Sequence, residues 1–173
     1  YEDRRNAERD RQAEQSLAGR DIGQLPEVVN PNRKAACERN FQLFCESYFP
    51  ETYSLAWSPD HLKVIEKIET AVLRGGLFAL ALPRGSGKTT ITESAALWSM
   101  LYGHREFVVL MGATESAALE LLDSLKTELE VNERLAEDFP EVCYPVAQLA
   151  GIANRCAGQL YKGERTRITW TSN

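Results

Sequence analysis

The sequence predicts an α/β domain in which a parallel sheet is flanked by helices. Two continuous apolar runs, LFALAL at 77–82 and FVVLM at 107–111, are typical of strands buried on both faces. Each run is followed by apolar residues at helical spacing, over 88–102 and 114–129. A third run, TRITW at 166–170, is also expected to form a strand. Alternating strands and helices indicate the α/β class.

The chain divides into three predicted parts. Residues 1–32 are expected to form a charged helix, over 2–19, and a proline-containing linker. Residues 33–76 are predicted to be a helical lead-in, and residues 77–173 the N-terminal portion of the α/β core. Positive and negative charges nearly balance in 2–19, which argues against an arm that binds nucleic acid.

Further helices are predicted from spacing and start signals. Apolar residues between 33 and 48 follow one helical face. Ser58-Pro59-Asp60 is a helix start, and Gly75-Gly76 is a helix end. The second helix should turn four side chains inward: Leu62, Ile65, Ile68 and Val72. Two shorter helices are expected at 132–138 and near 146–156.

Composition narrows the class of protein. The 173 residues carry a net charge of −5, which argues against a free-standing nucleic-acid binder. No apolar run approaches the ~18 residues that a membrane span needs, and no secretion signal is visible. The cysteines lack metal-site spacing and are expected to be buried thiols in a reducing, cytoplasmic compartment: Cys37, Cys45, Cys143 and Cys156.

The stretch LPRGSGKTT at 82–90 predicts a loop that binds phosphate. It follows an expected strand and opens an expected helix, which is the context that a G-x-x-x-x-G-K-[ST] pattern requires. Backbone N–H groups from Gly85 to Thr89 can surround the β- and γ-phosphates of ATP. Lys88 can reach the outer phosphates, and the Thr89 hydroxyl can bind Mg²⁺. The candidate cofactor-binding residues in the loop are Pro83, Arg84, Gly85, Ser86, Gly87, Lys88, Thr89 and Thr90.

The loop departs from the pattern at its first position, where Leu82 stands instead of glycine. Leu82 is better explained as the end of the buried strand, with Pro83 fixing the chain as it leaves. Arg84 has two interpretations: a cation held against the γ-phosphate, or a solvent-exposed surface charge. With these features the sequence predicts a variant P-loop NTPase that uses ATP and Mg²⁺.

The loop and its flanking segments resemble the large terminase subunits of tailed phages and their prophage relatives. The resemblance runs from about residue 20 onward, through SYFP, WSPDH, ALPRGSGKTT, ALWSMLYGH, FVVLMGATESAALELLDSLKTEL, DFPEVC and GQLYKGERTRITW. It implies catalytic roles for Lys88 and for Arg84 as the γ-phosphate arginine, and a magnesium role for Thr89. His61 falls where related ATPases place an adenine-recognising glutamine, and its other interpretation is a helix-capping or surface histidine.

The resemblance implies an ATPase that drives double-stranded DNA into a viral procapsid and carries a separate nuclease domain. It also implies a portal and a small terminase subunit as partners, a homo-oligomeric ring and no membrane. Neither a Walker B strand nor the acidic cluster of a nuclease is found, because LELLD at 119–123 has the wrong periodicity. The chain also begins with Tyr1. We therefore expect a fragment that binds nucleotide weakly or hydrolyses it poorly alone.

Two other functions stay open. One is a different P-loop NTPase, either helicase-like or a small-molecule kinase, although the basic residues after 150 are too scattered to define a kinase lid. The other is a non-enzymatic assembly module in which helix 2–19 docks on a partner and the loop is vestigial. Thr114 or Glu115 is expected either to couple nucleotide state to DNA or, in the case of Thr114, to cap a helix.

Overall fold

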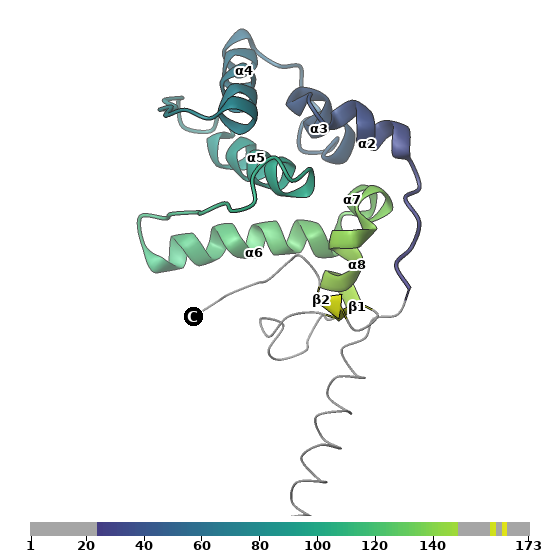
Figure 1. Ribbon diagram of the computed structural model, residues 1–173. Coiled ribbons are helices and arrows are strands. Elements are labelled where there is room, and N and C mark those ends of the chain that lie inside the picture. Colours follow the sequence, from purple (N-terminus) through teal and green to yellow (C-terminus); the bar gives the residue numbers. More distant parts are fainter. Residues whose placement is uncertain (1–23, 149–159, 162–163, 166–173) are drawn as a thin grey trace, which may run out of the picture. The chain divides into compact units, whose positions relative to one another are not determined.

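The computed structural model describes residues 24–148, 160–161 and 164–165. The chain forms two compact units, Val28–Asp138 and a second made of Tyr1–Glu27 with Phe139–Asn173. The described residues of the first unit fold into helices (Figure 1): α2 Pro31–Cys37, α3 Phe41–Tyr48, α4 Pro59–Arg74, α5 Lys88–Leu101, α6 Glu115–Val131 and α7 Glu133–Asp138. Those of the second unit form α8 Pro140–Gln148 and two strands, β1 Leu160–Tyr161 and β2 Glu164–Arg165.

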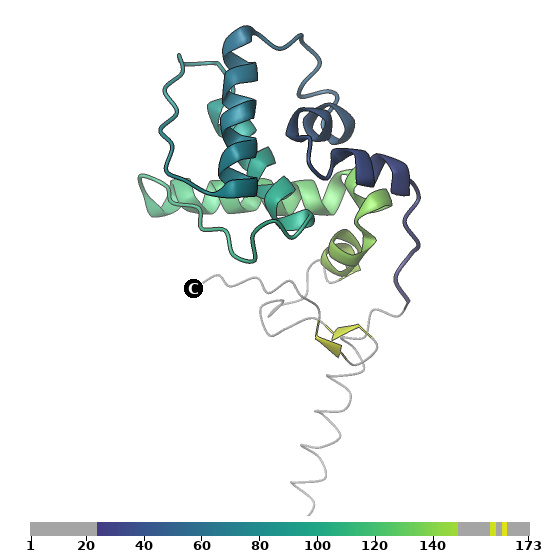
Figure 2. The same cartoon turned by 45° about the horizontal axis from the view of Figure 1, so that its top comes forward.

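The predicted α/β fold with a parallel sheet is wrong for the described part of the chain, which is helical. Neither 77–82 nor 107–111 is a strand, and both run as extended connections between helices (Figure 2). The strands that the structure does describe, β1 and β2, are two residues long and pair antiparallel. The predicted strand at 166–170 lies outside the described residues.

Exposure of the two apolar runs gives the physical reason for this difference. Leu77 is fully exposed, and Phe107 and Met111 are 82% and 87% exposed. An extended segment becomes a strand only when a neighbour pairs with its N–H and C=O groups. Apolar content predicts that a segment prefers burial, but it does not supply that neighbour. The apolar pattern therefore predicted two strands that the structure does not form.

The run 107–111 alternates between exposed and half-buried residues, and its exposed side is Phe107, Val109 and Met111. Contiguous exposed apolar side chains bind apolar dyes and promote association. We expect the double substitution Phe107→Thr/Met111→Thr to lower the fluorescence of bound anilinonaphthalene sulfonate and to reduce concentration-dependent association in light scattering. Leu55→Thr is the control, because Leu55 is 85% exposed in a separate turn. Equal dye binding by the wild type and the double variant would contradict the expectation.

Most predicted helices are confirmed. α5, α6 and α7 correspond to the predicted segments at 88–102, 114–129 and 132–138. α4 begins after Ser58, whose side chain accepts a hydrogen bond from the His61 N–H, and ends at Gly75 with a φ of 87°. Gly75 thus ends the helix with a positive φ, as the sequence predicted, but its ψ of 179° lies outside the left-handed helical region.

Two details of the helical prediction are wrong. The single helix over 33–48 is divided into α2 and α3, because the Asn40 side chain accepts from the Leu43 N–H and starts a new helix. On α4, Ile65 and Ile68 are buried as predicted, but Leu62 is 43% exposed. The predicted helix near 146–156 overlaps α8 only at its start, and its remainder lies outside the described residues.

α3 lies at the centre of the first unit and contacts α2, α4, α5 and α7 (Figure 1). Its aromatic residues are fully buried and pack against each other and against α5. The ring centroids of Phe41 and Trp98 are 5.3 Å apart, and those of Phe44 and Tyr48 are 4.9 Å apart. The Trp98 indole N–H donates to the Cys37 carbonyl at 2.9 Å. Aromatic packing and this buried hydrogen bond therefore join α5 to α2 and α3.

A buried carboxylate joins α2 and α3 to α7. Asp138 is fully buried, and its Oδ2 accepts from Arg33 Nε and from the Tyr48 hydroxyl, each at 2.6 Å. Its Oδ1 accepts from Arg33 at 3.0 Å and from the Asn30 N–H at 3.2 Å. Burial alone raises the pKa of Asp138, but the hydrogen bonds from Arg33 and Tyr48 outweigh burial and hold this pKa below its usual value.

Cys37, Cys45 and Cys143 are buried, as predicted, while Cys156 lies outside the described residues. Burial raises the pKa of the Cys45 thiol, which keeps it protonated and unreactive. In the part of the chain that the structure describes, no helix has the length and apolarity of a membrane span. The predicted charged helix at 2–19 lies outside the described residues.

Candidate phosphate-binding loop

The glycine-rich loop leads directly into α5. Gly85 and Gly87 have φ angles of +79° and +70°, a region that glycine adopts without steric cost. Gly87 is the N-cap of α5 and makes no side-chain cap, and the helix begins at Lys88. The first N–H groups of an α-helix have no partner inside the helix, and the helix dipole makes this end attractive to anions. The local geometry thus provides donors for an anion.

Lys88 folds back over the loop that precedes it. Its ammonium group donates to the carbonyl oxygen of Leu82 and, at 2.8 Å, to that of Pro83. The Ser86 hydroxyl also donates to the Pro83 carbonyl, at 2.7 Å. These bonds hold the positive charge beside the start of α5. A phosphate oxygen would offer Lys88 a stronger, charge-assisted partner than a neutral carbonyl.

There is open space beside the two glycines of the loop. A Cβ added at Gly85 or Gly87 would meet no atom within 4 Å other than those of the adjoining residues. Arg84 is exposed on the loop, and Thr89 is exposed in the first turn of α5. The residues from Pro83 to Thr90 that the sequence singled out thus form the loop and the first turn of α5. The roles of Arg84 at the γ-phosphate and of Thr89 at Mg²⁺ stay predictions.

His61 contacts the loop from the first turn of α4. Its Nε2 lies 3.1 Å from the carbonyl oxygen of Ser86, and its Nδ1 lies 3.0 Å from the Ser58 hydroxyl. A carbonyl only accepts, so Nε2 carries the proton and Nδ1 accepts from Ser58. The resemblance to terminases implied that His61 recognises adenine, and the alternative was a helix-capping or surface histidine. Because both ring nitrogens have protein partners, contact of either one with adenine would require a hydrogen bond to break.

An aromatic row, which we define as Tyr53, Trp57 and His61, supports this contact. The Tyr53 and Trp57 rings are stacked with centroids 5.0 Å apart, and Trp57 meets the His61 ring edge-on at 6.1 Å. The Tyr53 hydroxyl is 2.8 Å from the hydroxyl of Ser94 on α5. Sequence reasoning missed this row, although its aromatic residues recur at every fourth position and gave a signal.

Two other predicted features have a defined place in the helices. Thr114 is the N-cap of α6, and its side chain accepts from the Ala117 N–H at 3.2 Å. The capping interpretation of Thr114 is therefore confirmed. The segment 119–123, excluded as a Walker B strand on periodicity, lies inside α6. No group of three or more histidine, cysteine, aspartate or glutamate side chains in the described ranges could hold a metal ion.

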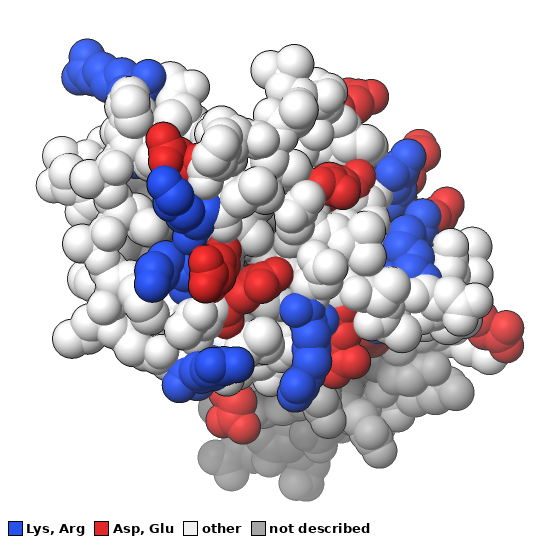
Figure 3. Space-filling model, turned by 90° about the horizontal axis from the view of Figure 1, so that it is seen from above, with Lys and Arg blue, Asp and Glu red and all other residues white. Residues whose placement is uncertain are grey.

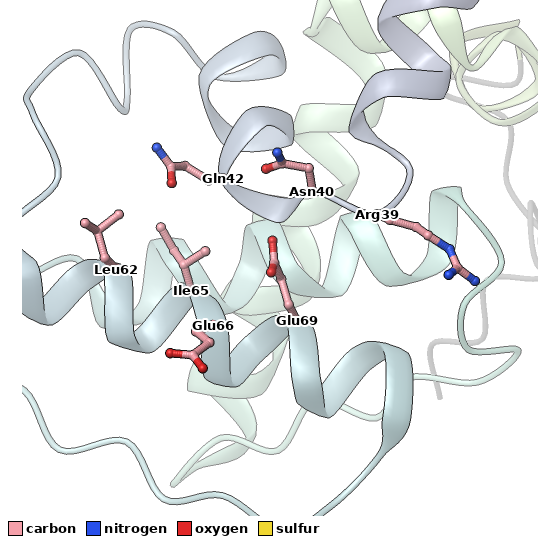
Figure 4. Close-up of a pocket in the computed structure, with 7 residues that line it drawn as sticks. All are labelled: Arg39, Asn40, Gln42, Leu62, Ile65, Glu66 and Glu69. Carbon is pink, nitrogen blue, oxygen red and sulfur yellow. The ribbon is translucent and has the colours of Figure 1, made fainter.

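A separate hollow of about 350 Å³ lies between α3 and α4 (Figure 4), with this lining: Arg39, Asn40, Gln42, Leu62, Ile65, Glu66 and Glu69. Glu69 accepts from the Phe41 N–H at 2.8 Å, which places a negative charge at the start of α3. Arg39 points away from the other side chains in this view. No residue of the glycine-rich loop lines the hollow, and one of its two carboxylates, that of Glu69, serves the contact between α3 and α4.

The charge distribution offers no broad basic face on the side seen from above (Figure 3). There, Lys and Arg side chains lie beside Asp and Glu side chains. This mixture on one face agrees with the net charge of −5.

Comparison with known proteins adds no relative on which to base a function. No protein-family model, curated protein or solved structure matches the chain. The likeness to large terminase subunits therefore rests on the residues of the sequence alone.

Proposed function

We propose that the loop at 83–89 and the first turn of α5 bind the polyphosphate of ATP, together with Mg²⁺. The observation that carries the proposal is the junction itself: two left-handed glycines lead into an α-helix without a side-chain cap, and the ammonium of Lys88 lies over the loop. Backbone donors, a helix dipole and a nearby lysine cation are the three features that phosphate binding uses. Thr89 would supply a hydroxyl ligand to Mg²⁺.

We further propose that this site belongs to an ATPase motor that moves double-stranded DNA, as in the large terminase subunits that the sequence resembles. The support for this proposal is the form of the loop: Leu82 replaces the first glycine of the usual pattern, and Pro83 and Arg84 follow it. A portal, a small terminase subunit and a ring of identical subunits are the partners that this proposal implies. Hydrolysis also needs a carboxylate that positions water, which none of the described loop residues provides.

The test of phosphate binding is the substitution Lys88→Ala. We expect it to weaken Mg-ATP binding by about 10- to 100-fold, since a charge-assisted hydrogen bond contributes about 1.5–3 kcal/mol. The measurement is isothermal titration calorimetry with ATP and with AMP, and AMP should bind weakly because it lacks the outer phosphates. Lys67→Ala, an exposed lysine on α4, is the matched control and should bind ATP like the wild type.

Equal affinity of the wild type and Lys88→Ala for ATP would refute the phosphate role. Equal affinity for ATP and AMP would instead show that the nucleoside, not the polyphosphate, is recognised. A motor and a kinase are distinguished by what stimulates hydrolysis: double-stranded DNA in the first case, a small phosphate acceptor in the second. Failure of ATP to bind at all would favour a non-enzymatic assembly module.

A further inference from the structure

The peptide group between Ser86 and Gly87 lies inside the loop and is held from one side. The carbonyl oxygen of Ser86 accepts from His61 Nε2, while the Gly87 N–H belongs to the same peptide unit. The structure describes no cis peptide bond, so this unit is trans. In a planar trans peptide the C=O and N–H bonds point in opposite directions. A hydrogen bond to the oxygen therefore directs the N–H to the side of the loop away from His61.

We propose that His61 is a positioning residue of the phosphate-binding loop: it anchors the Ser86 carbonyl and thereby aims the Gly87 N–H at the polyphosphate. This inference rests on the proposed function of the loop. Glycine has more backbone freedom than any other residue type, and the φ of +70° at Gly87 is only one of the conformations open to it. Anchoring the adjoining carbonyl removes part of that freedom before the ligand arrives, which is preorganisation.

The surroundings of His61 are built to hold its ring in this orientation. Ser58 Oγ accepts from the His61 backbone N–H at 3.3 Å and donates to Nδ1, which selects the tautomer with the proton on Nε2. Trp57 packs against the ring, and the Trp57 indole N–H donates to Glu46 at 2.7 Å. These contacts orient the His61 ring toward the Ser86 carbonyl.

The aromatic row also connects the anchor to the helix that the loop opens. Tyr53 stacks on Trp57 and its hydroxyl is bonded to Ser94, which is buried in α5. The row therefore contacts the loop at Ser86 and α5 at Ser94. A change at His61 would alter the conformation of the loop without removing any group that touches phosphate.

The test compares two substitutions at His61 and two ligands. His61→Phe keeps an aromatic ring against Trp57 but removes the donor to Ser86, whereas His61→Gln keeps an N–H donor. Binding of ATP and of inorganic tripolyphosphate is measured by calorimetry at low temperature, with folding checked by circular dichroism. We expect His61→Phe to weaken both ligands about tenfold and His61→Gln to restore most of the affinity.

Equal losses for the two ligands identify an effect on the loop, because tripolyphosphate has no base. A loss confined to ATP would instead assign His61 to the adenine and would overturn the inference, as would unchanged affinity in His61→Phe. Ser58→Gly is an independent variant that removes the partner of Nδ1 at little cost to the helix cap. It should weaken both ligands to a smaller extent, and no change there would also count against the role.

These outcomes differ from a failure of the proposed function. If the wild type binds neither ATP nor tripolyphosphate, the phosphate role of the loop and the inference about His61 are both wrong. If the wild type binds both and Lys88→Ala binds both more weakly, but His61→Phe binds like the wild type, only the inference is wrong.

Discussion

Replacing Asp138 by asparagine is expected to lower the free energy of unfolding by about 3 kcal/mol, since removing one partner of a buried ion pair is strongly destabilising and leaves Arg33 only the more exposed carboxylate of Glu137. Asp138 is fully buried and accepts from Arg33 through both oxygens. The asparagine amide would turn a donor toward the Arg33 guanidinium, whose side chain is only 21% exposed. Urea unfolding followed by circular dichroism measures the loss.

Glu137→Gln is the matched control for Asp138→Asn. Glu137 also pairs with Arg33, at 2.6 Å, but its side chain is 44% exposed. Water screens an exposed pair, so this substitution should cost less than about 1 kcal/mol. Equal losses in the two variants would show that burial of Asp138 is not what makes the contact strong.

The same residue predicts how stability depends on pH. The pKa of Asp138 is lower in the folded protein than its usual value, because the hydrogen bonds from Arg33 and Tyr48 outweigh burial. In acid the unfolded chain then binds the proton more readily than the folded chain does. The contribution of Asp138 is complete above about pH 4, the ordinary aspartate pKa, and disappears as the pH falls through the lowered value. Wild type should therefore lose more stability than Asp138→Asn between neutral pH and acid; parallel losses would contradict this.

Trp98→Ala is expected to cost about 3–5 kcal/mol, the range for removing a large aromatic side chain from a core. Trp98 is fully buried against Phe41, and its indole N–H donates to the carbonyl of Cys37. The substitution leaves a cavity. It also leaves the carbonyl of Cys37, the last residue of α2, without the hydrogen bond from the indole. Urea unfolding is followed by circular dichroism, because the variant lacks one of the tryptophans that fluorescence would report.

Two further variants separate the contributions of core packing and of the indole hydrogen bond to the free energy that Trp98→Ala loses. Trp98→Phe retains most of the packing and removes the indole N–H, so it should cost about 1 kcal/mol for the hydrogen bond, in addition to a smaller packing loss. Met100→Ala lies on the same helix but at a 36% exposed position, and it should cost much less than Trp98→Ala. A Met100→Ala loss as large as that of Trp98→Ala would mean that burial in the core is not what makes removal of the Trp98 side chain costly.

The loop at 83–89 was predictable from the sequence because its conformation is local. Gly85 and Gly87 adopt positive φ, and Lys88 starts the helix that the pattern predicted. Helix starts behave alike: Ser58 and Thr114 cap through bonds to residues three positions along the chain. Glycine freedom and capping bonds depend on neighbours within a few residues, and such neighbours are visible in any sequence.

The contacts of His61 and Asp138 were not predictable in this way. Ser86 lies 25 residues from His61, and Arg33 lies 105 residues from Asp138. The sequence showed a histidine at a helix start and an acid before Phe139-Pro140, but nothing in it named their partners. The regular spacing of Tyr53, Trp57 and His61 was the one available sign of a supporting row.

By itself, the sequence determined where the chain turns, where most helices begin, and which residues form the glycine-rich loop. Only the tertiary structure decided that 77–82 and 107–111 stay extended without forming a parallel sheet in the described residues, and that His61 faces the Ser86 carbonyl. Helical hydrogen bonds form within one segment, so local pattern predicts them. A strand depends on a partner elsewhere in space, and so does the orientation of a side chain toward a distant carbonyl.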